Sequence, residues 1–253
     1  QGRQERAGPF AGEGELLLVS TRLDVVRDAL HVVGPVVVEA AAAHADEAPG
    51  TTVLALFDLD HTLLSGDSDV LWCDFLMDHG LLDRAEFAPR NADMESRYKA
   101  GTVGVEEFTH FFISTLAGRT PAEWEPWRQR FMAEVVAPRL PPDAHALVQR
   151  HLTAGDTVVL TTATNRFITE LTARHLQIDH LIATDCAMDA QGRFTGLSTG
   201  ALNMREGKVV RLNAWLQSRG ETLAATHSTA YSDSSNDLPL LGAVNVAVAV
   251  DPD

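Results

Sequence analysis

The amino-acid sequence predicts an α/β fold, a doubly wound and mostly parallel sheet that carries an inserted all-helical domain. The first observation is a series of short apolar runs of strand length, with stretches of helical spacing between the earlier ones. The second is the stretch 67–150, where apolar residues recur at helical spacing and no comparable run occurs. Strands separated by helices favour a parallel sheet covered on both faces. The runs lie at 53–57, 157–161, 180–184, 229–232 and 244–250.

The segment before the first apolar run is interpreted as an appendage of uncertain structure. It comprises residues 1–50 and mixes glycine, alanine, glutamate and arginine with short apolar stretches. The predicted α/β core, a Rossmann-like sheet domain, then comprises residues 51–66 and 151–253. The predicted helical cap comprises residues 67–150.

One connection within the core predicts a hairpin. Asp189-Ala190-Gln191-Gly192 has the composition of a tight turn, because aspartate and glycine tolerate the backbone angles that such turns need. Short strand-like segments flank this turn at 183–188 and 193–197. A small hairpin is therefore expected to project from the sheet.

The charge of the chain argues against two classes of partner. It contains 20 Lys and Arg residues against 35 Asp and Glu residues, a formal net charge of -15. Such a field repels the phosphate backbone of nucleic acids and anionic membranes, so we expect a small-molecule partner instead. Any anion-binding site must then take its positive potential from a lysine, helix N-termini or a bound cation.

Cysteine content and hydropathy indicate the compartment. Cys73 and Cys186 share no C-x-x-C spacing and are too few for a disulfide framework, which is typical of a chain from a reducing compartment. No stretch approaches the roughly 18 uncharged apolar residues of a membrane span. We therefore expect a cytoplasmic protein without a membrane segment, and the sequence does not indicate its oligomeric state.

Two carboxylates follow directly on the first apolar run. In Asp58-Leu59-Asp60-His61-Thr62 they stand where ligand sites of open α/β sheets lie, outside the carboxyl end of a strand. Carboxylates this close repel one another, and the repulsion raises a pKa unless a cation intervenes. Asp58 and Asp60 therefore suit a metal site or an acid/base pair. A solvated turn with a helix N-cap is the structural alternative.

A second acidic cluster follows the run at 229–232. It contains Asp233, Asn236 and Asp237, and Pro239 marks the start of a helix just after it. Two strand ends with aspartates can converge on one hard cation, and oxygen ligands suit Mg²⁺. A capping role for Asn236 or Asp237 is the alternative, and it leaves Asp233 unexplained.

Two further candidates carry groups that bind phosphate. Thr162 lies where a predicted strand ends and a helix begins, so its hydroxyl and the neighbouring N–H groups can face a phosphate, with Thr164 or Asn165 as the N-cap. Lys208 starts a predicted helix whose apolar face is formed by other residues, which leaves the lysine available to a cleft. A solvated lysine is the commoner arrangement at such a position.

Taken in order, these motifs resemble those of the haloacid dehalogenase-like (HAD) phosphohydrolase superfamily. Its pattern is D-x-D-x-T, a strand ending in Ser or Thr, a lysine, and a D-x-x-x-D cluster, and the resemblance covers residues 53–251. The position of the helical insert, Gly207-Lys208 and the segment 232–237 most resemble the phosphoserine-phosphatase branch with a helical cap.

The resemblance implies a phosphatase and a role for each motif. Asp58 would attack phosphorus and form an aspartyl phosphate, and Asp60 would protonate the leaving alkoxide and then activate water. The superfamily's pumps have threonine at the position of Asp60, so this residue favours a phosphatase. Mg²⁺ would be held by Asp58, the backbone carbonyl of Asp60 and Asp233, with Asp237 in or near its coordination shell. The residues implied to contact the substrate are Thr162, Lys208, Asn236 and Asp67.

The substrate class follows from Asp67, nine positions after Asp58 (67 minus 58). In the phosphoserine phosphatases an acidic residue at this offset faces the substrate ammonium, which implies a small amine-bearing phosphomonoester. Asp67 also suits a plain helix N-cap. A substrate carboxylate would need an arginine, and the arginines available in the insert are Arg84, Arg90, Arg97 and Arg119.

Several alternatives stay open on these residues. Histidinol phosphate and phosphoethanolamine carry an amine but no carboxylate, so they satisfy Asp67 as well as phosphoserine does. A phosphotransferase of the same chemistry would pass the phosphoryl group to an alcohol instead of water. The alternative outside enzymes is an inactive module that keeps the fold and binds a ligand.

Overall fold

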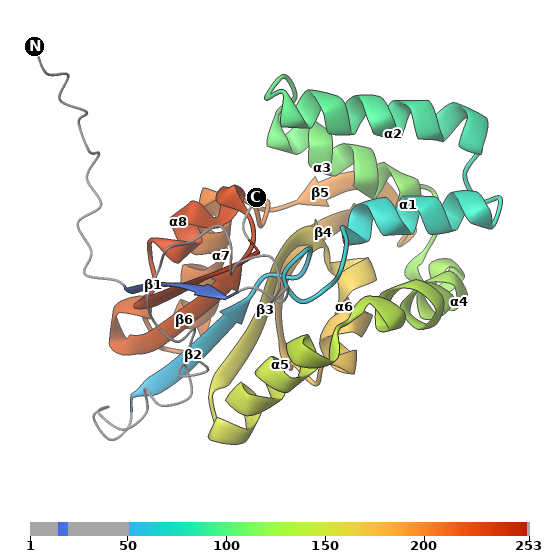
Figure 1. Ribbon diagram of the computed structural model, residues 1–253. Coiled ribbons are helices and arrows are strands. Elements are labelled where there is room, and N and C mark those ends of the chain that lie inside the picture. Colours follow the sequence, from blue (N-terminus) through green and yellow to red (C-terminus); the bar gives the residue numbers. More distant parts are fainter. Residues whose placement is uncertain (1–14, 20–50, 252–253) are drawn as a thin grey trace, which may run out of the picture.

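The structure is a computed structural model that describes residues 15–19 and 51–251. Its centre is a seven-stranded sheet with the strand order β1-β7-β6-β2-β3-β4-β5 (Figure 1). Hydrogen-bonded neighbours run parallel, except for β4 and β5, which form an antiparallel hairpin. The strands are β1 (Glu15–Val19), β2 (Thr52–Phe57), β3 (Thr157–Asn165), β4 (His180–Met188), β5 (Phe194–Thr199), β6 (Thr226–Ser232) and β7 (Val246–Val250).

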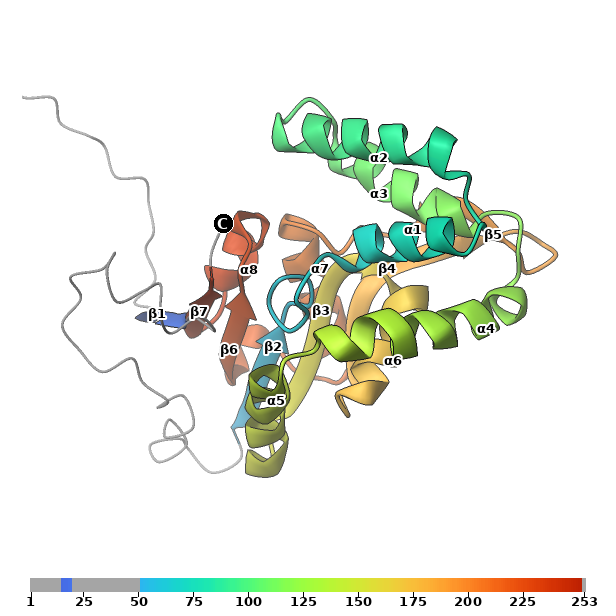
Figure 2. The same ribbon diagram turned by 45° about the vertical axis from the view of Figure 1, so that its right-hand side comes forward.

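Helices cover both faces of the sheet, which confirms the predicted doubly wound α/β class. Figure 2 shows α5 and α6 on one face and α7 and α8 on the other. In the described parts of the chain, no helix combines the length and apolar character needed to cross a membrane. The α-helices are α1 (Ser68–Asp78), α2 (Arg84–Lys99), α3 (Val105–Ile113), α4 (Pro121–Phe131), α5 (Pro142–Ala154), α6 (Arg166–His175), α7 (Glu206–Ser218) and α8 (Leu238–Leu241). Short 3-10 turns lie at Ser114–Leu116, Ala137–Arg139, Leu223–Ala225 and Ser235–Asp237, and Met132–Val136 is a π-helical turn.

Polar side chains explain where two of these helices begin. Asp67 accepts a hydrogen bond from the N–H of Val70 at 2.9 Å and caps α1. Asn165 accepts one from the N–H of Ile168 at 3.2 Å and caps α6. Each cap satisfies an N–H that has no partner inside the helix. Of the two caps predicted for α6, the structure therefore has Asn165.

The central strand β2 alternates between the two cores. Ala55 and Phe57 face the cluster beneath α5 and α6, whereas Leu54 and Leu56 face the cluster beneath α7 and α8. Successive side chains of a strand point to opposite faces, so a strand buried on both sides is apolar throughout. This accounts for the continuous apolar run at 53–57.

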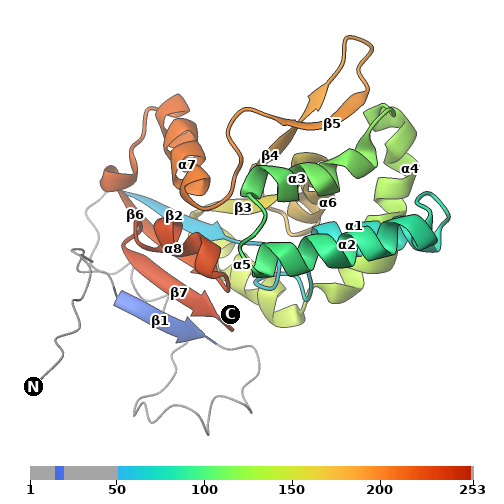
Figure 3. The same cartoon turned by 90° about the horizontal axis from the view of Figure 1, so that it is seen from above.

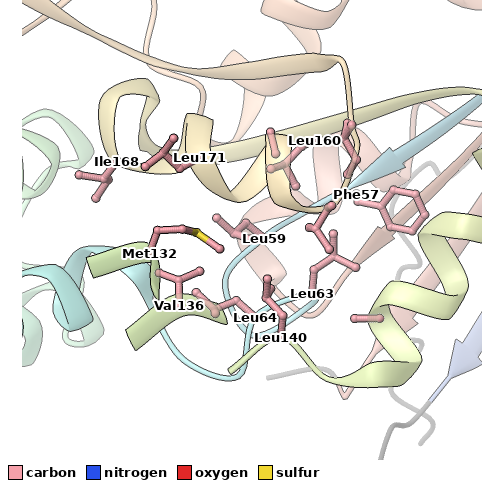
Figure 4. Packing of buried hydrophobic residues seen from close by; sticks show 14 of the residues in the cluster. Phe57, Leu59, Leu63, Leu64, Met132, Val136, Leu140, Leu160, Ile168 and Leu171 are labelled. Atoms are coloured by element: carbon pink, nitrogen blue, oxygen red, sulfur yellow. The ribbon is translucent and has the colours of Figure 1, made fainter. Parts of the chain in front are cut away.

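The larger core also fixes the loop that follows β2. Figure 4 shows Leu59 and Leu63 of this loop pointing into the same cluster as Leu160 of β3 and Leu171 of α6. Leu59 and Leu63 are almost completely buried. Because its apolar side chains are held in the core, the loop has a fixed course across the carboxyl end of β2.

A separate apolar cluster joins α1, α2 and α3 on the side of the sheet where the strands end (Figure 1). The division of the chain into core and cap at residues 66 and 150 stays a prediction. The second of these boundaries falls inside α5, whose Val148 is packed beneath the sheet. The buried members of the cluster are Cys73, Met77, Phe87, Met94, Val103, Phe111 and Phe112.

Strand β1 comes from the segment that the sequence interprets as an appendage. It pairs in parallel with β7, from Glu15 opposite Val246 to Val19 opposite Val250. The rest of the segment 1–50 lies outside the described residues.

The hairpin predicted around 189–192 is present as β4 and β5. Asp185 pairs with Thr199, and Met188 pairs with Phe194, in antiparallel register. Figure 3, seen from above, shows its tip projecting away from the rest of the sheet.

Candidate active site

Three adjacent strands in the middle of the sheet, β6, β2 and β3, deliver the predicted site residues. Phe57 ends β2 and lies opposite Leu160 of β3 and Tyr231 of β6. Asp58 follows directly, and its N–H donates to the carbonyl of Tyr231 at 2.9 Å. The carboxyl ends of these parallel strands therefore meet at one edge, where open α/β sheets bind their ligands.

Lys208 is the buried cation of this site. Its Nζ donates to Oδ1 of Asp58 at 2.8 Å and to Oδ2 of Asp237 at 2.5 Å, and only 2% of the residue is exposed. Burial lowers the pKa of Lys208, but attraction to the two carboxylates outweighs it and holds this pKa above its ordinary value. The lysine is therefore charged and points into the site, unlike a solvated lysine at a helix start.

The turn that brings Lys208 to this position depends on Gly207. A Cβ at Gly207 would lie 2.0 Å from the carbonyl oxygen of Leu202, a separation that no side chain can occupy. Glycine thus permits the loop before α7 to close tightly against the helix start.

Asp58 lies in an environment with excess negative charge. Burial raises its pKa well above the ordinary value, Lys208 lowers it, and the charges of Asp237 and Asp60 raise it further. The carboxylate still faces one ammonium at hydrogen-bond distance. Asp58 is thus a desolvated carboxylate that additional positive charge would stabilise.

Asp60 is held by two hydrogen bonds from neighbouring elements. Its Oδ1 accepts from the N–H of Ser68 at 2.7 Å, and its Oδ2 accepts from the hydroxyl of Thr164 at 2.9 Å. Burial and then the charge of Asp67 raise the pKa of Asp60 to about 6, against the lowering effect of these hydrogen bonds. A carboxyl group with this pKa can donate and accept a proton near neutral pH.

Thr162 is completely buried and lies within β3, which continues to Asn165 and so ends later than the sequence predicts. Its hydroxyl oxygen accepts from the N–H of Thr164 at 3.2 Å, which leaves its own proton available to an acceptor in the site. Asn203, in the loop before α7, also fixes this region. Its Nδ2 lies 2.9 Å from the carbonyl of Thr162, 2.9 Å from that of Ile182 and 3.0 Å from Oγ1 of Thr161.

Asn203 was missed by the sequence analysis, because no local pattern marks it. Its partners lie on β3 and β4, about forty residues and about twenty residues away in the chain, so only the folded structure brings them together. By joining β3 and β4 to the loop before α7, Asn203 connects Thr162 to the loop that leads to Lys208.

Asp233 and Asp237 both lie at the end of β6 but have different partners. Thr62 donates to Oδ1 of Asp233 at 2.8 Å, and its oxygen accepts from the Asp233 N–H at 3.0 Å. This pair joins the two acidic motifs. Asp237 is buried and accepts from the hydroxyl of Ser232 at 2.8 Å in addition to Lys208.

Asn236, a predicted substrate contact, lies between the two aspartates. Its Oδ1 accepts from Tyr98 Oη at 3.3 Å and from Arg205 Nε at 3.0 Å. Tyr98 belongs to α2 and Arg205 immediately precedes α7. Three segments that are distant in sequence therefore meet at one amide oxygen.

Asp67 and Asp69 place further carboxylates beside Asp60. Burial raises the pKa of Asp67, which also caps α1 as the structural alternative predicted. Oδ2 of Asp69 lies 3.3 Å from the hydroxyl oxygen of Thr164, and burial followed by the charges of Asp67 and Asp60 raises the pKa of Asp69 well above the ordinary value. Asp69 was also missed. The signal was its spacing from Asp67, but only the position of Thr164 turns that spacing into a shared site.

The oxygen atoms at the end of β2 and after β6 are candidate ligands for a divalent cation. Within the described residues, no three acidic, histidine or cysteine side chains converge as a ready-made metal site. Asp58 and Asp233, which follow adjacent strands, offer two carboxylates, and the carbonyl of Asp60 offers a third oxygen. An all-oxygen set completed by waters suits Mg²⁺. The carboxylates around Lys208 outnumber its single charge, so the residues fit a bound cation.

The four arginines considered for a substrate carboxylate have partners inside the insert. Arg84 pairs with Asp78, and Arg90 lies 3.7 Å from Glu86. Arg97 pairs with Glu107 at 3.0 Å. The fourth, Arg119, lies over the ring of Trp124 with its guanidinium carbon 4.5 Å from the ring centroid.

Comparison with known proteins adds a family and several relatives. The family model described as haloacid dehalogenase-like hydrolase matches residues 55–242. A histidinol-phosphatase of Neisseria meningitidis serogroup C is 40% identical over 79% of this chain and 90% of its own length. A phosphoserine phosphatase of Mycobacterium tuberculosis is 31% identical over 84% of this chain and 70% of its own length.

Solved structures agree with the fold. The crystal structure of a protein of unknown function from Bordetella pertussis Tohama I is 46% identical and has a TM-score of 0.77, covering 80% of this chain and 92% of that one. A substrate-bound phosphoserine phosphatase has a TM-score of 0.57 over 80% of this chain and 87% of its own. At 16% identity, this second likeness concerns the fold alone.

Proposed function

The chain belongs to the haloacid dehalogenase-like hydrolase family and is a phosphatase of that family, and we propose that it hydrolyses a small amine-bearing phosphomonoester through an aspartyl phosphate on Asp58. The observation that carries the proposal is the buried contact of Lys208 with Asp58 and Asp237, with Asp60 held close by. A nucleophile, a phosphate-binding cation and a titratable acid thus occur together at the end of β2.

In the first half of the reaction, Asp58 attacks phosphorus. A bond forms between a carboxylate oxygen and phosphorus, and the bond between phosphorus and the leaving alkoxide oxygen breaks. Asp60, in its protonated form, gives its proton to that oxygen, for which a pKa of about 6 is suited.

In the second half, Asp60 acts as the base. Its carboxylate takes a proton from a water molecule that attacks the aspartyl phosphate, the bond from Asp58 to phosphorus breaks, and inorganic phosphate leaves. Thr162 donates its hydroxyl proton, and Lys208 an N–H, to the phosphoryl oxygens throughout. Asn236 contacts the substrate from the loop after β6.

Mg²⁺ is the proposed cofactor. Asp58, the carbonyl of Asp60 and Asp233 would hold it, with Asp237 in or near its coordination shell, and when bound it would neutralise charge on the phosphoryl group. The excess of carboxylates in the site supports this assignment. The proposed setting is the cytoplasm, in keeping with the unpaired cysteines.

The proposed substrate carries an amine and no carboxylate. Asp69 and Asp60 both lie beside the Thr164 hydroxyl, and burial raises the pKa of Asp67 and Asp69, so an ammonium group beside them would stabilise their charged forms. The arginines of the insert that a carboxylate would need are engaged elsewhere. Histidinol phosphate therefore comes before phosphoserine among the candidates, in keeping with the name of the 40% identical relative.

A substrate panel tests this proposal. Phosphate release is measured with Mg²⁺ on histidinol phosphate, phosphoethanolamine, phosphoserine and a generic aryl phosphate, with and without an acceptor alcohol, and with Asp58→Asn as the control. We expect one amine-bearing ester to be hydrolysed fastest and the variant to release no phosphate. A folded, Mg²⁺-loaded wild type that cleaves none of these esters would instead indicate an inactive ligand-binding module. Transfer to the alcohol would indicate a phosphotransferase.

A further inference from the structure

The oxygen Oδ1 of Asn236 is the meeting point of the cap helix α2, the loop before α7 and the acidic loop after β6. Tyr98 donates to it from the end of α2 at 3.3 Å, and Arg205 donates to it at 3.0 Å. We refer to Tyr98, Asn236 and Arg205 as the clasp. Asn236 lies in the 3-10 turn between Asp233 and Asp237, so the clasp acts on the loop that carries both aspartates.

Tyr98 is well placed to hold this position. Its ring stacks on that of Phe108 of α3, with centroids 4.0 Å apart and planes 27° apart, and its hydroxyl lies 4.0 Å from the sulfur of Met204. The ring is therefore fixed by α3 on one side and by the loop before α7 on the other. The hydroxyl is the part of Tyr98 that reaches Asn236.

The same face of α2 extends towards the other side of the site. Glu95 precedes Tyr98 by one helical turn, and burial together with a smaller effect of Glu95 raises the pKa of Asp67. Helix α2 therefore spans from the neighbourhood of Asp67 to Asn236. Figure 3 shows α2 and α3 side by side on the upper side of the molecule.

Arg205 has a backbone conformation that residues other than glycine rarely adopt. Its φ of 53° lies in the left-handed region, which costs a non-glycine residue backbone energy and persists only when the surroundings stabilise it. It lies three positions before Lys208, so its hydrogen bond to Asn236 also connects the loop carrying Lys208 to the loop carrying the aspartates.

We propose that Tyr98 is a positioning residue for the phosphatase reaction, which orients Asn236 when α2 is seated over the site and so couples the position of the cap to substrate binding. This inference rests on the proposed function, in which Asn236 contacts the substrate. Tyr98 itself contacts no reacting atom. Its hydroxyl and the Arg205 guanidinium fix the amide oxygen, while Nδ2 donates to Oγ of Ser234 in the same loop at 3.3 Å, so the seated cap and this loop together set the orientation of the amide.

A double-mutant cycle tests the coupling. Tyr98→Phe removes the hydroxyl and keeps the ring that stacks on Phe108, and we expect it to lower kcat/KM about five-fold, the loss expected for one net hydrogen bond. In an Asn236→Ala background the same change is expected to alter kcat/KM less than about 1.5-fold. Asp93→Asn, an exposed position on the same helix, is the matched control and should leave kcat/KM unchanged.

Two outcomes of the cycle would overturn the inference. One is an equal fall in kcat/KM for Tyr98→Phe in both backgrounds, which would assign the effect to packing. The other is a wild-type value for Tyr98→Phe.

Hydrogen exchange gives a reading that does not need turnover. In Tyr98→Phe, amide exchange should quicken both at 96–103 and at 233–237, whereas Asp93→Asn should leave 233–237 as in the wild type. Unchanged exchange at 233–237 in Tyr98→Phe would refute the clasp even in an active enzyme. If the wild type hydrolyses no phosphomonoester, the proposed function fails, while the exchange result still decides whether Tyr98 holds Asn236.

Discussion

Substitution of Asn203 gives the sharpest test of how the fold builds the phosphate-binding end of the site. Asn203→Ala removes an amide nitrogen whose two N–H groups lie among three buried acceptors, at 2.9 to 3.0 Å from the nitrogen. A buried group left without its partner costs about 1 to 3 kcal/mol. Two of the acceptors are strand carbonyls with a second lone pair. In addition, Oδ1 of Asn203 is buried without a hydrogen-bond partner, so removing this oxygen offsets part of the cost. We therefore expect a net loss of about 2 to 4 kcal/mol in the free energy of unfolding.

The substitution Asn203→Asp should make the free energy of unfolding depend on pH. A carboxylate at this buried position has a raised pKa, so the folded state binds more protons than the unfolded state and stability falls as the pH rises. Its loss of stability relative to the wild type should therefore be larger near pH 8 than near pH 5, by about 1.4 kcal/mol for each unit by which the raised pKa exceeds 5.

Urea unfolding followed by tryptophan fluorescence measures both effects, with Asn245→Ala as the control. Asn245 is an exposed residue in the loop before β7, away from Thr162, and its side-chain oxygen accepts from the N–H and the hydroxyl of Ser228 of β6 at 2.9 Å. Both alanine variants should lose stability, and only Asn203→Ala should raise KM. A loss below about 1 kcal/mol for Asn203→Ala, or the same loss for Asn203→Asp at both pH values, would refute the reasoning.

Three further predictions concern charge. Hydrogen bonds from Arg166 and Arg211 overcome the effect of burial and lower the pKa of Asp185, so its stabilising contribution is present at neutral pH and is lost as the pH falls. Asp185→Asn should therefore cost about 1 kcal/mol near pH 7, and the difference from wild type in urea unfolding should shrink as the pH falls below about 4 and vanish only below the lowered pKa of the folded state. Chelation with EDTA should abolish phosphate release and added Mg²⁺ should restore it; full activity after exhaustive chelation would contradict the metal assignment. Asp67→Asn and Asp69→Asn should each raise KM for an amine-bearing ester about ten-fold and change KM for an aryl phosphate little, and an equal rise for both esters would argue against amine recognition.

The features that could be predicted are those that depend on local sequence patterns. The apolar run at 53–57 is buried on both faces, and a strand of this kind at the centre of a parallel sheet leaves its next residue, Asp58, at the edge where ligands bind. The same reasoning applies to Asp233, which follows β6, and to Thr162 in the second half of β3, because both strands are neighbours of β2. The fold class and the grouping of these residues therefore followed from the sequence.

Some site residues were missed in the sequence, and others had a plain structural role as their alternative. The surroundings of these residues depend on contacts between distant segments. Asn203 and Asp69 gain their surroundings from β3, β4 and Thr164, and no spacing along the chain encodes that proximity. Lys208 has the sequence context of a solvated lysine, and the two carboxylates that pair with its ammonium group lie on other elements. Strand β1 likewise needs β7 as its partner, at the far end of the chain.

The N–H of Asp58 donates to the carbonyl of Tyr231, within a strand that has neighbours on both sides. Asp58, the proposed nucleophile, is thus anchored to the central strands of the sheet, and releasing it requires these strands to separate. Heat inactivation of the chemistry should then coincide with global unfolding. The helices that lie over the site are not part of this sheet. We therefore expect that substitutions in these helices can change which ester is preferred while Asp58 keeps its position.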